Sequence, residues 1–142
     1  MTASEIRSEI RVFVYGTLKP GERFHQSYCA DRLTSAQPAI ARGQLFHLSL
    51  CGYPAMIVGD RPVRGFLLSF TEPSILSNLD WLEDYDPNSS PELNYYNRQQ
   101  IEVFDVDGNS LGQAWAYIMN PERVRANGGI DLVDGCWEGN KY

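Results

Sequence analysis

The sequence predicts an α+β fold, in which a small mixed β-barrel or curled sheet is flanked by helices. Much of the 142-residue chain consists of short runs rich in Val, Ile, Phe and Tyr, which are typical of strands. Only two segments, 22–33 and 71–85, have a helical pattern. Many strands with two helices inserted between them favour this class over a doubly wound parallel sheet.

The strand-like runs are separated by turn signals. Six strands are expected, at Arg11–Tyr15, Ile40–Leu50, Pro54–Val58, Val63–Phe70, Tyr95–Val106 and Gln113–Met119. The last two flank Asp107-Gly108, a dipeptide that favours a tight hairpin, so we expect them to pair antiparallel. The segment 86–94 and the residues from Pro121 onward are interpreted as loops. We therefore expect one domain over residues 1–142, with a core at about 11–120 and a polar C-terminal tail.

Composition limits the partners and the compartment. The chain has 12 basic and 18 acidic residues, a formal charge of −6, and no local basic patch, so we expect no nucleic-acid and no membrane partner. The start is polar, and the longest later apolar run, Gly65–Phe70, is too short to span a membrane. Three widely spaced cysteines and two histidines predict neither disulfides nor a metal site. The polar start, the lack of a spanning run and the cysteine usage predict a cytoplasmic protein. Nucleotide-binding glycine motifs are absent, so we expect no cofactor.

The first predicted strand ends in an unusual way, with the run VFVYGTLKPG over Val12–Gly21. A buried strand that ends in Gly16-Thr17 leaves main-chain N–H groups without ladder partners, and glycine lets another group approach them closely. Such amides can bind an anion or a carbonyl oxygen. An ordinary strand end has the same composition, so both interpretations stand at this point.

The second predicted helix carries an acid on its apolar face. At about 100° per residue from Ile75, Leu79 lies near 40° and Leu82 near −20°, which defines the apolar stripe. Glu83 falls near 80°, inside the stripe, whereas Asp80 lies on its shoulder and Asp84 opposite. Burial would raise the pKa of the Glu83 carboxyl and make it a candidate general base. The alternative is a structural ion pair with Arg98 or Arg64.

Two other pairs of residues have a spacing that can serve chemistry. His25 and Cys29 lie four residues apart on the first predicted helix, where an imidazole can activate a thiolate, but no third orienting group accompanies them. A half-buried helix face is the simpler interpretation. Trp115 and Tyr117 alternate on one strand face, which is typical of core packing and less often of a ligand wall.

Three segments in chain order resemble the gamma-glutamylcyclotransferase-like family, also called AIG2-like. They are the Y-G-T-L-x-x-G run of Tyr15–Gly21, the D-x-x-E of Asp80–Glu83 and the Y-x-R of Tyr96–Arg98. The resemblance spans roughly Val12–Tyr117. It implies a mixed small barrel with flanking helices and a cleft between the strand end and the acid.

The resemblance also implies roles for individual residues. Glu83 corresponds to the catalytic base. The backbone that binds the glutamyl unit corresponds to Tyr15, Gly16, Thr17 and Leu18. Tyr96 and Arg98 either pack beside the cleft or contact the ligand, and Tyr117 is a weaker pocket-wall candidate. Two departures stand out: Asp84 replaces the glycine common in the family, and the segment 86–93 is longer than the loop of many relatives.

The reaction implied by the resemblance acts on a small-molecule γ-glutamyl substrate. Its α-amine attacks its own γ-carbonyl, which releases an amine and 5-oxoproline and needs no metal or cofactor. Two alternatives remain open, a non-catalytic protein that binds γ-glutamyl ligands, and a structural domain in which Glu83 lies outside any cleft. The leaving amine and the oligomeric state are left open by the sequence.

Overall fold

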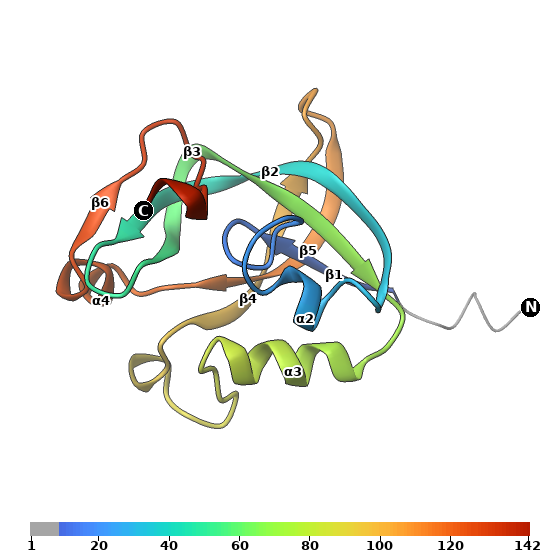
Figure 1. The fold of residues 1–142 in the computed structure, drawn as a ribbon, viewed down its shortest axis with the longest axis horizontal. Helices are drawn as coiled ribbons and strands as arrows, with labels where there is room; N and C mark the ends of the chain where they lie inside the picture. Colours follow the sequence, from blue (N-terminus) through green and yellow to red (C-terminus); the bar gives the residue numbers. More distant parts are fainter. Residues whose placement is uncertain (1–8) are drawn as a thin grey trace, which may run out of the picture.

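A computed structural model describes residues 9–142, and its sheet has six strands in the spatial order β3-β1-β5-β4-β2-β6 (Figure 1). The strands are β1 (Ile10–Val14), β2 (Leu33–Leu48), β3 (Tyr53–Phe70), β4 (Asn97–Phe104), β5 (Ser110–Ile118) and β6 (Gly129–Asp131). The helices are α2 (His25–Tyr28), α3 (Ser74–Leu82) and α4 (Pro121–Ala126), with 3₁₀ turns η1 (Pro91–Leu93) and η2 (Gly139–Lys141). Residues 1–8, part of the polar start, lie outside the described residues.

The sheet curls back on itself. The long strands β2 and β3 form an antiparallel hairpin that arches over the molecule, and β2 pairs on its other side with β4 and β6 (Figure 1). The antiparallel ladder between β2 and β4 is short, because only Ile40 pairs with Phe104 and Ala41 with Val103. Strands β1 and β5 run parallel, and their ladder is the single pair of Val12 with Trp115. The predicted α+β class is confirmed, and these short ladders make the sheet a curled one rather than a regular barrel.

Residues of β1 alternate between two hydrophobic cores, as the period of a strand requires. Val12 and Val14 pack with the residues that bury α3, and Phe13 packs on the opposite side, inside the curl. Helix α3 lies along the sheet and buries Ile75 and Leu79 completely (Figure 1). This packing fixes the end of α3 beside the end of β1.

Several predicted element boundaries are corrected by the structure. The runs expected at 54–58 and 63–70 belong to the single strand β3. The helix expected at 22–33 is reduced to the single turn α2, which buries none of its own residues. In its place the chain forms tight turns, in which the Phe24 N–H donates to the Thr17 carbonyl over 2.8 Å. Helix α3 is shorter than the predicted 71–85: it spans Ser74–Leu82, with Pro73 at its N-cap.

The C-terminal segment is not the polar tail that the sequence predicts. It forms α4 and then β6, which pairs with the end of β2. Val124 of α4 and Trp137 are both 3% exposed. Val124 belongs to the core that buries α3, and Trp137 belongs to the other core. Single buried residues set among polar neighbours produce no periodic pattern, which explains the incorrect prediction.

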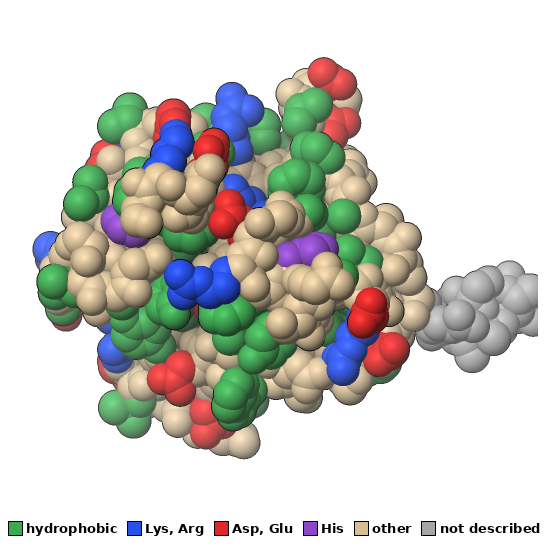
Figure 2. Space-filling view, viewed as in Figure 1, with side chains coloured by type: hydrophobic (Ala, Val, Ile, Leu, Met, Phe, Trp, Pro, Cys, Tyr) green, Lys and Arg blue, Asp and Glu red, His purple; other side chains and the backbone are tan. Residues whose placement is uncertain are grey.

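The predicted hairpin around Asp107-Gly108 is confirmed. Strands β4 and β5 pair antiparallel from Asn97–Ile118 to Phe104–Ser110, and Gly108 has the positive φ of 91° that such a turn requires. Over residues 9–142, no helix is long and apolar enough to cross a membrane. Figure 2 shows Lys and Arg side chains scattered singly among acidic and hydrophobic ones on the face in view.

Candidate active site

A cavity of about 190 Å³ lies where the end of β1 meets the start of β3 and the end of α3. Seven of the eight predicted site residues line it, namely Tyr15, Gly16, Thr17, Leu18, Glu83, Tyr96 and Tyr117. Arg98 is the exception and does not line the cavity. Residues far apart in the sequence thus meet in one place through the pairing of β1, β3, β4 and β5.

The turn after β1 offers main-chain N–H groups to the cavity. Its carbonyls are used within the fold, since Gly16 accepts from the Lys19 N–H at 3.0 Å and Leu18 from the His25 ring at 2.8 Å. The N–H groups of Gly16, Thr17 and Leu18 donate to no acceptor among residues 9–142. A Cβ on Gly16 would collide with the Pro54 ring, so only glycine fits here. We call the Gly16–Leu18 main chain the amide cradle.

Glu83 immediately follows the last helical residue of α3, and its N–H donates to the Leu79 carbonyl at 2.9 Å. Its side chain reaches the cavity on the apolar side of the helix. Burial of the carboxyl raises its pKa from 4.5 to about 7. No hydrogen bond or ion pair within the described chain holds this carboxylate, so the ion pair with Arg98 or Arg64 is not formed.

Three tyrosines surround the Glu83 carboxyl, and each directs its hydroxyl elsewhere. The Tyr15 hydroxyl donates to the Tyr117 carbonyl at 2.6 Å, and that of Tyr96 to the Pro54 carbonyl at 2.7 Å. The Tyr117 hydroxyl donates to Oδ1 of Asp80 at 2.7 Å. Burial, with the nearby Glu83 charge adding to it, raises the pKa of all three phenols, which therefore stay neutral. The Glu83 oxygens keep free lone pairs, as a proton acceptor requires.

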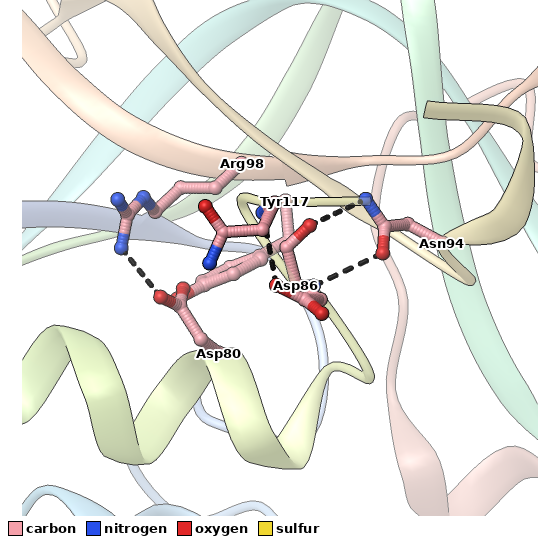
Figure 3. A network of polar contacts seen from close by, with 6 residues as sticks. Asp80, Asp86, Asn94, Arg98 and Tyr117 are labelled. Atoms are coloured by element: carbon pink, nitrogen blue, oxygen red, sulfur yellow. Dashed lines mark hydrogen bonds and ion pairs between the residues drawn. The ribbon is translucent and has the colours of Figure 1, made fainter. Parts of the chain in front are cut away.

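Asp80 contacts one residue of β4 and one of β5 beside the cavity. Its Oδ2 lies 2.7 Å from Nη1 of Arg98, while its Oδ1 accepts from Tyr117 (Figure 3). The Arg98 guanidinium also lies 4.8 Å from the Trp115 ring centre and 5.4 Å from that of Tyr85. Of the two interpretations left open for Arg98, these contacts favour packing beside the cleft.

The helix end places Asp84 in a conformation that favours glycine. Its φ is 55°, and the flanking hydrogen bonds, Tyr85 N–H to the Asp80 carbonyl and Asp84 N–H to the Trp81 carbonyl, form a Schellman motif. The family departure at this position therefore coincides with a strained backbone site. The exposed Asp84 side chain lines the cavity.

The long loop that follows is pinned back onto the fold. The buried Asn94 accepts from the Asp86 N–H at 3.0 Å and donates to the Asp86 carbonyl at 3.2 Å (Figure 3). These two bonds close the segment between them into a compact surface loop. They also bring Tyr95 and Tyr96 to the cavity wall.

The C-terminal segment forms hydrogen bonds with the loop that carries the amide cradle. The buried Lys19 ammonium donates to the Trp137 carbonyl, and the Gly139 N–H donates to the Glu22 carboxylate at 3.2 Å. The Trp137 indole donates to Nδ1 of His47 at 3.0 Å, and the Tyr142 ring stacks on His47 with centres 3.6 Å apart. Burial lowers the pKa of His47, which keeps it neutral as an acceptor.

Sequence reasoning missed a large part of the cavity wall. Phe24, Tyr53, Pro54 and Tyr95 line it, and none belongs to the three motifs. The position of Asp80 opposite Arg98 could have been inferred by pairing D-x-x-E with Y-x-R. A role for Cys29 as a thiolate activated by His25 is not supported, because burial raises the pKa of the Cys29 thiol to about 12.

Comparison with known proteins identifies relatives of this chain. Residues 12–139 match the family described as gamma-glutamyl cyclotransferase, AIG2-like. The chain is 33% identical over 110 residues to the gamma-L-glutamyl-butirosin B gamma-glutamyl cyclotransferase of Niallia circulans, covering 77% of this chain and 66% of that protein. It is 30% identical over 139 residues to CG2811 of Drosophila melanogaster, which bears the name of a gamma-glutamylcyclotransferase, with 87% and 80% of the two chains covered.

Solved structures share the fold. An AIG2-like protein from Mus musculus superimposes with a TM-score of 0.67 at 20% identity, over 92% of this chain and 88% of that one. YkqA from Bacillus subtilis gives 0.65 at 21% identity, over 92% of this chain and 40% of that one. The family match over residues 12–139, together with the motifs and the cavity, shows that the chain belongs to the AIG2-like gamma-glutamyl cyclotransferase family.

Proposed function

We propose that the protein is a γ-glutamyl cyclotransferase that releases 5-oxoproline and a free amine from a γ-glutamyl compound, with Glu83 as general base and then general acid. The observation that carries this proposal is the half-buried Glu83, whose carboxyl has no hydrogen-bond or ion-pair partner in the described chain and lines one cavity with an amide cradle that has no acceptor there. The names of the relatives in the family agree with this activity.

The raised pKa of Glu83 suits proton transfer from the α-ammonium of the substrate. An ordinary glutamate near 4.5 facing an α-ammonium near 8 leaves a gap of about 3.5 units, roughly 5 kcal/mol. At a pKa of about 7 the gap falls to about one unit, or roughly 1.4 kcal/mol. Burial of the acid thus removes most of the thermodynamic cost of generating the free amine.

The reaction then proceeds within the bound substrate. The free α-amine attacks the γ-carbonyl carbon, the carbonyl π electrons move to oxygen, and a five-membered ring closes. The ring nitrogen then carries one proton too many and the former carbonyl oxygen is an oxyanion. The protonated Glu83 gives its proton to the leaving nitrogen as the C–N bond breaks and the carbonyl re-forms. The Glu83 carboxylate so regenerated takes the extra proton from the ring nitrogen and passes it to the released amine, which leaves neutral lactam and an ammonium. Because the nucleophile is part of the substrate, correct positioning alone corresponds to an effective molarity of about 10⁵ M or more.

The amide cradle is suited to hold the oxygens of the glutamyl unit. The cavity-lining residues include no Lys, Arg or His, so among the described residues the main-chain N–H groups and the hydroxyls of Thr17 and Tyr53 are the donors available to an anionic oxygen there. Preorganised amides of this kind stabilise carboxylates and tetrahedral oxyanions. The buried Tyr15, Tyr96 and Tyr117 enclose the same end and exclude water from it.

The test is the Glu83→Gln variant, assayed for 5-oxoproline release from a panel of γ-glutamyl amines and peptides. Loss of a proton-transfer group of this kind costs about 10²–10⁴-fold in turnover. Glu92→Gln removes an exposed glutamate that does not line the cavity and serves as the matched control. Wild-type turnover in Glu83→Gln would overturn the role of Glu83. Saturable binding of 5-oxoproline by the wild type, with no product from any substrate, would identify a binding protein instead.

A further inference from the structure

We propose that Asp84 makes the enzyme selective for γ-glutamyl substrates whose leaving amine carries a second positive charge. This inference rests on the proposed function, and it deepens it by naming the class of the leaving group.

The cavity has a closed end and an open end. Tyr15, Tyr96 and Tyr117 are 4–7% exposed and lie at the closed end with the amide cradle. The part-exposed rings of Phe24, Tyr53 and Tyr95 and the exposed Asp84 form the open end. A glutamyl unit that contacts the cradle and Glu83 fills the closed end, so the leaving amine points toward the open end.

The charge of the cavity wall is entirely acidic. Glu83 and Asp84 are the ionisable acids that line it, and no basic side chain does. Glu83 is engaged in proton transfer, which leaves the Asp84 carboxylate facing the departing group. Within residues 9–142, Asp84 forms neither a salt bridge nor a side-chain hydrogen bond. A carboxylate at a φ of 55° is also costlier than glycine there, and such strain concentrates at functional sites.

Two arginines outside the cavity contact the aromatic rings at its open end. The guanidinium of Arg23 lies 5.8 Å from the Phe24 ring centre and 5.5 Å from that of Tyr53. That of Arg123 lies 5.2 Å from the Tyr95 ring centre. Neither arginine lines the cavity, and each already uses a ring of its wall as a cation–π partner, so the attraction of a cationic leaving group falls to the Asp84 carboxylate.

Asp84 also borders a second hollow of about 560 Å³ over the end of α3. Its wall includes Trp81, which is 77% exposed, together with Tyr85 and Asp86. An amine that extends past Asp84 therefore has room beyond the cavity, along a surface with aromatic and acidic groups. A flexible chain that ends in an ammonium fits this surface better than a neutral or anionic one.

The experiment compares two γ-glutamyl amines that differ in one charge, γ-glutamyl-1,4-diaminobutane and γ-glutamyl-n-pentylamine. At low ionic strength we expect the wild type to favour the diamine by about fivefold in kcat/KM, as one exposed ion pair allows, and salt to reduce this ratio. Asp84→Asn keeps a residue that tolerates a positive φ and removes the charge. We expect this variant to bring the ratio close to one.

Asp60→Asn is the control, because it removes an exposed charge that does not line the cavity and should leave the ratio unchanged. Equal use of the two substrates by the wild type, or an unchanged ratio in Asp84→Asn, would overturn the role of Asp84 while the cyclotransferase activity stands. Failure of the wild type to turn over either substrate or any other γ-glutamyl amine would instead overturn the proposed function.

Discussion

The carboxylate of Asp80 and the guanidinium of Arg98 form an ion pair with a separation of 2.7 Å, in which both side chains are less than one-fifth exposed. The second oxygen of Asp80 holds the Tyr117 hydroxyl, and the Tyr117 carbonyl holds the Tyr15 hydroxyl. One chain of contacts thus links the D-x-x-E, the Y-x-R and the end of β1. Arg98 acts on the cavity through these residues rather than by lining it.

The first prediction concerns this ion pair. Arg98→Met should lower the free energy of unfolding by about 2–4 kcal/mol, because it leaves a largely buried carboxylate without its cation. Arg61→Met is the matched control. Its partner Asp131 lies at 2.8 Å, but both side chains are about 40% exposed, so the loss should stay below about 1 kcal/mol. Urea unfolding measures both, and equal losses would contradict the structural importance given to Arg98.

The second prediction is the pH dependence of the reaction. Glu83 must be ionised to accept a proton, so kcat/KM should fall as the pH drops through its pKa of about 7. The acid limb of the profile should therefore have its midpoint near pH 7. A midpoint near the ordinary glutamate value of 4.5 would show that the carboxyl is solvated and that burial does not tune it.

The third prediction concerns the effect of the raised Glu83 pKa on the stability of the fold. The pKa of Glu83 is raised in the folded state, so its contribution to stability is fully present below about pH 4.5 and is lost as the pH rises through about 7. Glu83→Gln stays neutral throughout and should be more stable than the wild type at pH 8, by about 3 kcal/mol for a pKa raised from 4.5 to about 7. At pH 4.5 the two proteins should be alike. Thermal unfolding at both pH values tests this, and a pH-independent difference would argue against a buried charge.

The fourth prediction concerns the end of α3. Asp84 has a φ of 55° in a Schellman motif, so Asp84→Gly should raise the free energy of unfolding by about 0.5–1 kcal/mol. Asp84→Ala removes the same carboxylate without relieving the backbone and should give no such gain. Denaturant unfolding of the two variants separates backbone relief from charge removal, and equal stabilities would rule out the strain.

The fifth prediction concerns Lys19, whose ammonium donates to the Trp137 carbonyl beneath the amide cradle. In Lys19→Met this buried carbonyl loses its partner and the loop is held less firmly. We expect KM for a γ-glutamyl substrate to rise several-fold with a smaller change in kcat, since the altered loop binds the substrate and Glu83 is untouched. Lys141→Met, an exposed lysine close by, is the control. A loss confined to kcat would contradict a positioning role.

The sequence predicts the site better than the outline of the fold. The inward position of Glu83 follows from the 3.6-residue period over Ile75–Leu82, and the glycine at the end of β1 from strand chemistry alone. The truncated helix α2 was predicted wrongly because its turns depend on contacts with Thr17 and Leu18 that composition does not encode. The role of Trp137 was missed because its partners, Lys19 and His47, lie 118 and 90 residues away. The functional roles of the eight site residues stay predictions until the variants are assayed.

Because Trp137 and Gly139 form hydrogen bonds with Lys19 and Glu22, the segment 137–142 supports the loop that carries the amide cradle. A perturbation of residues 137–142 should therefore be felt as an altered affinity for a ligand at the cradle, although none of these residues lines the cavity.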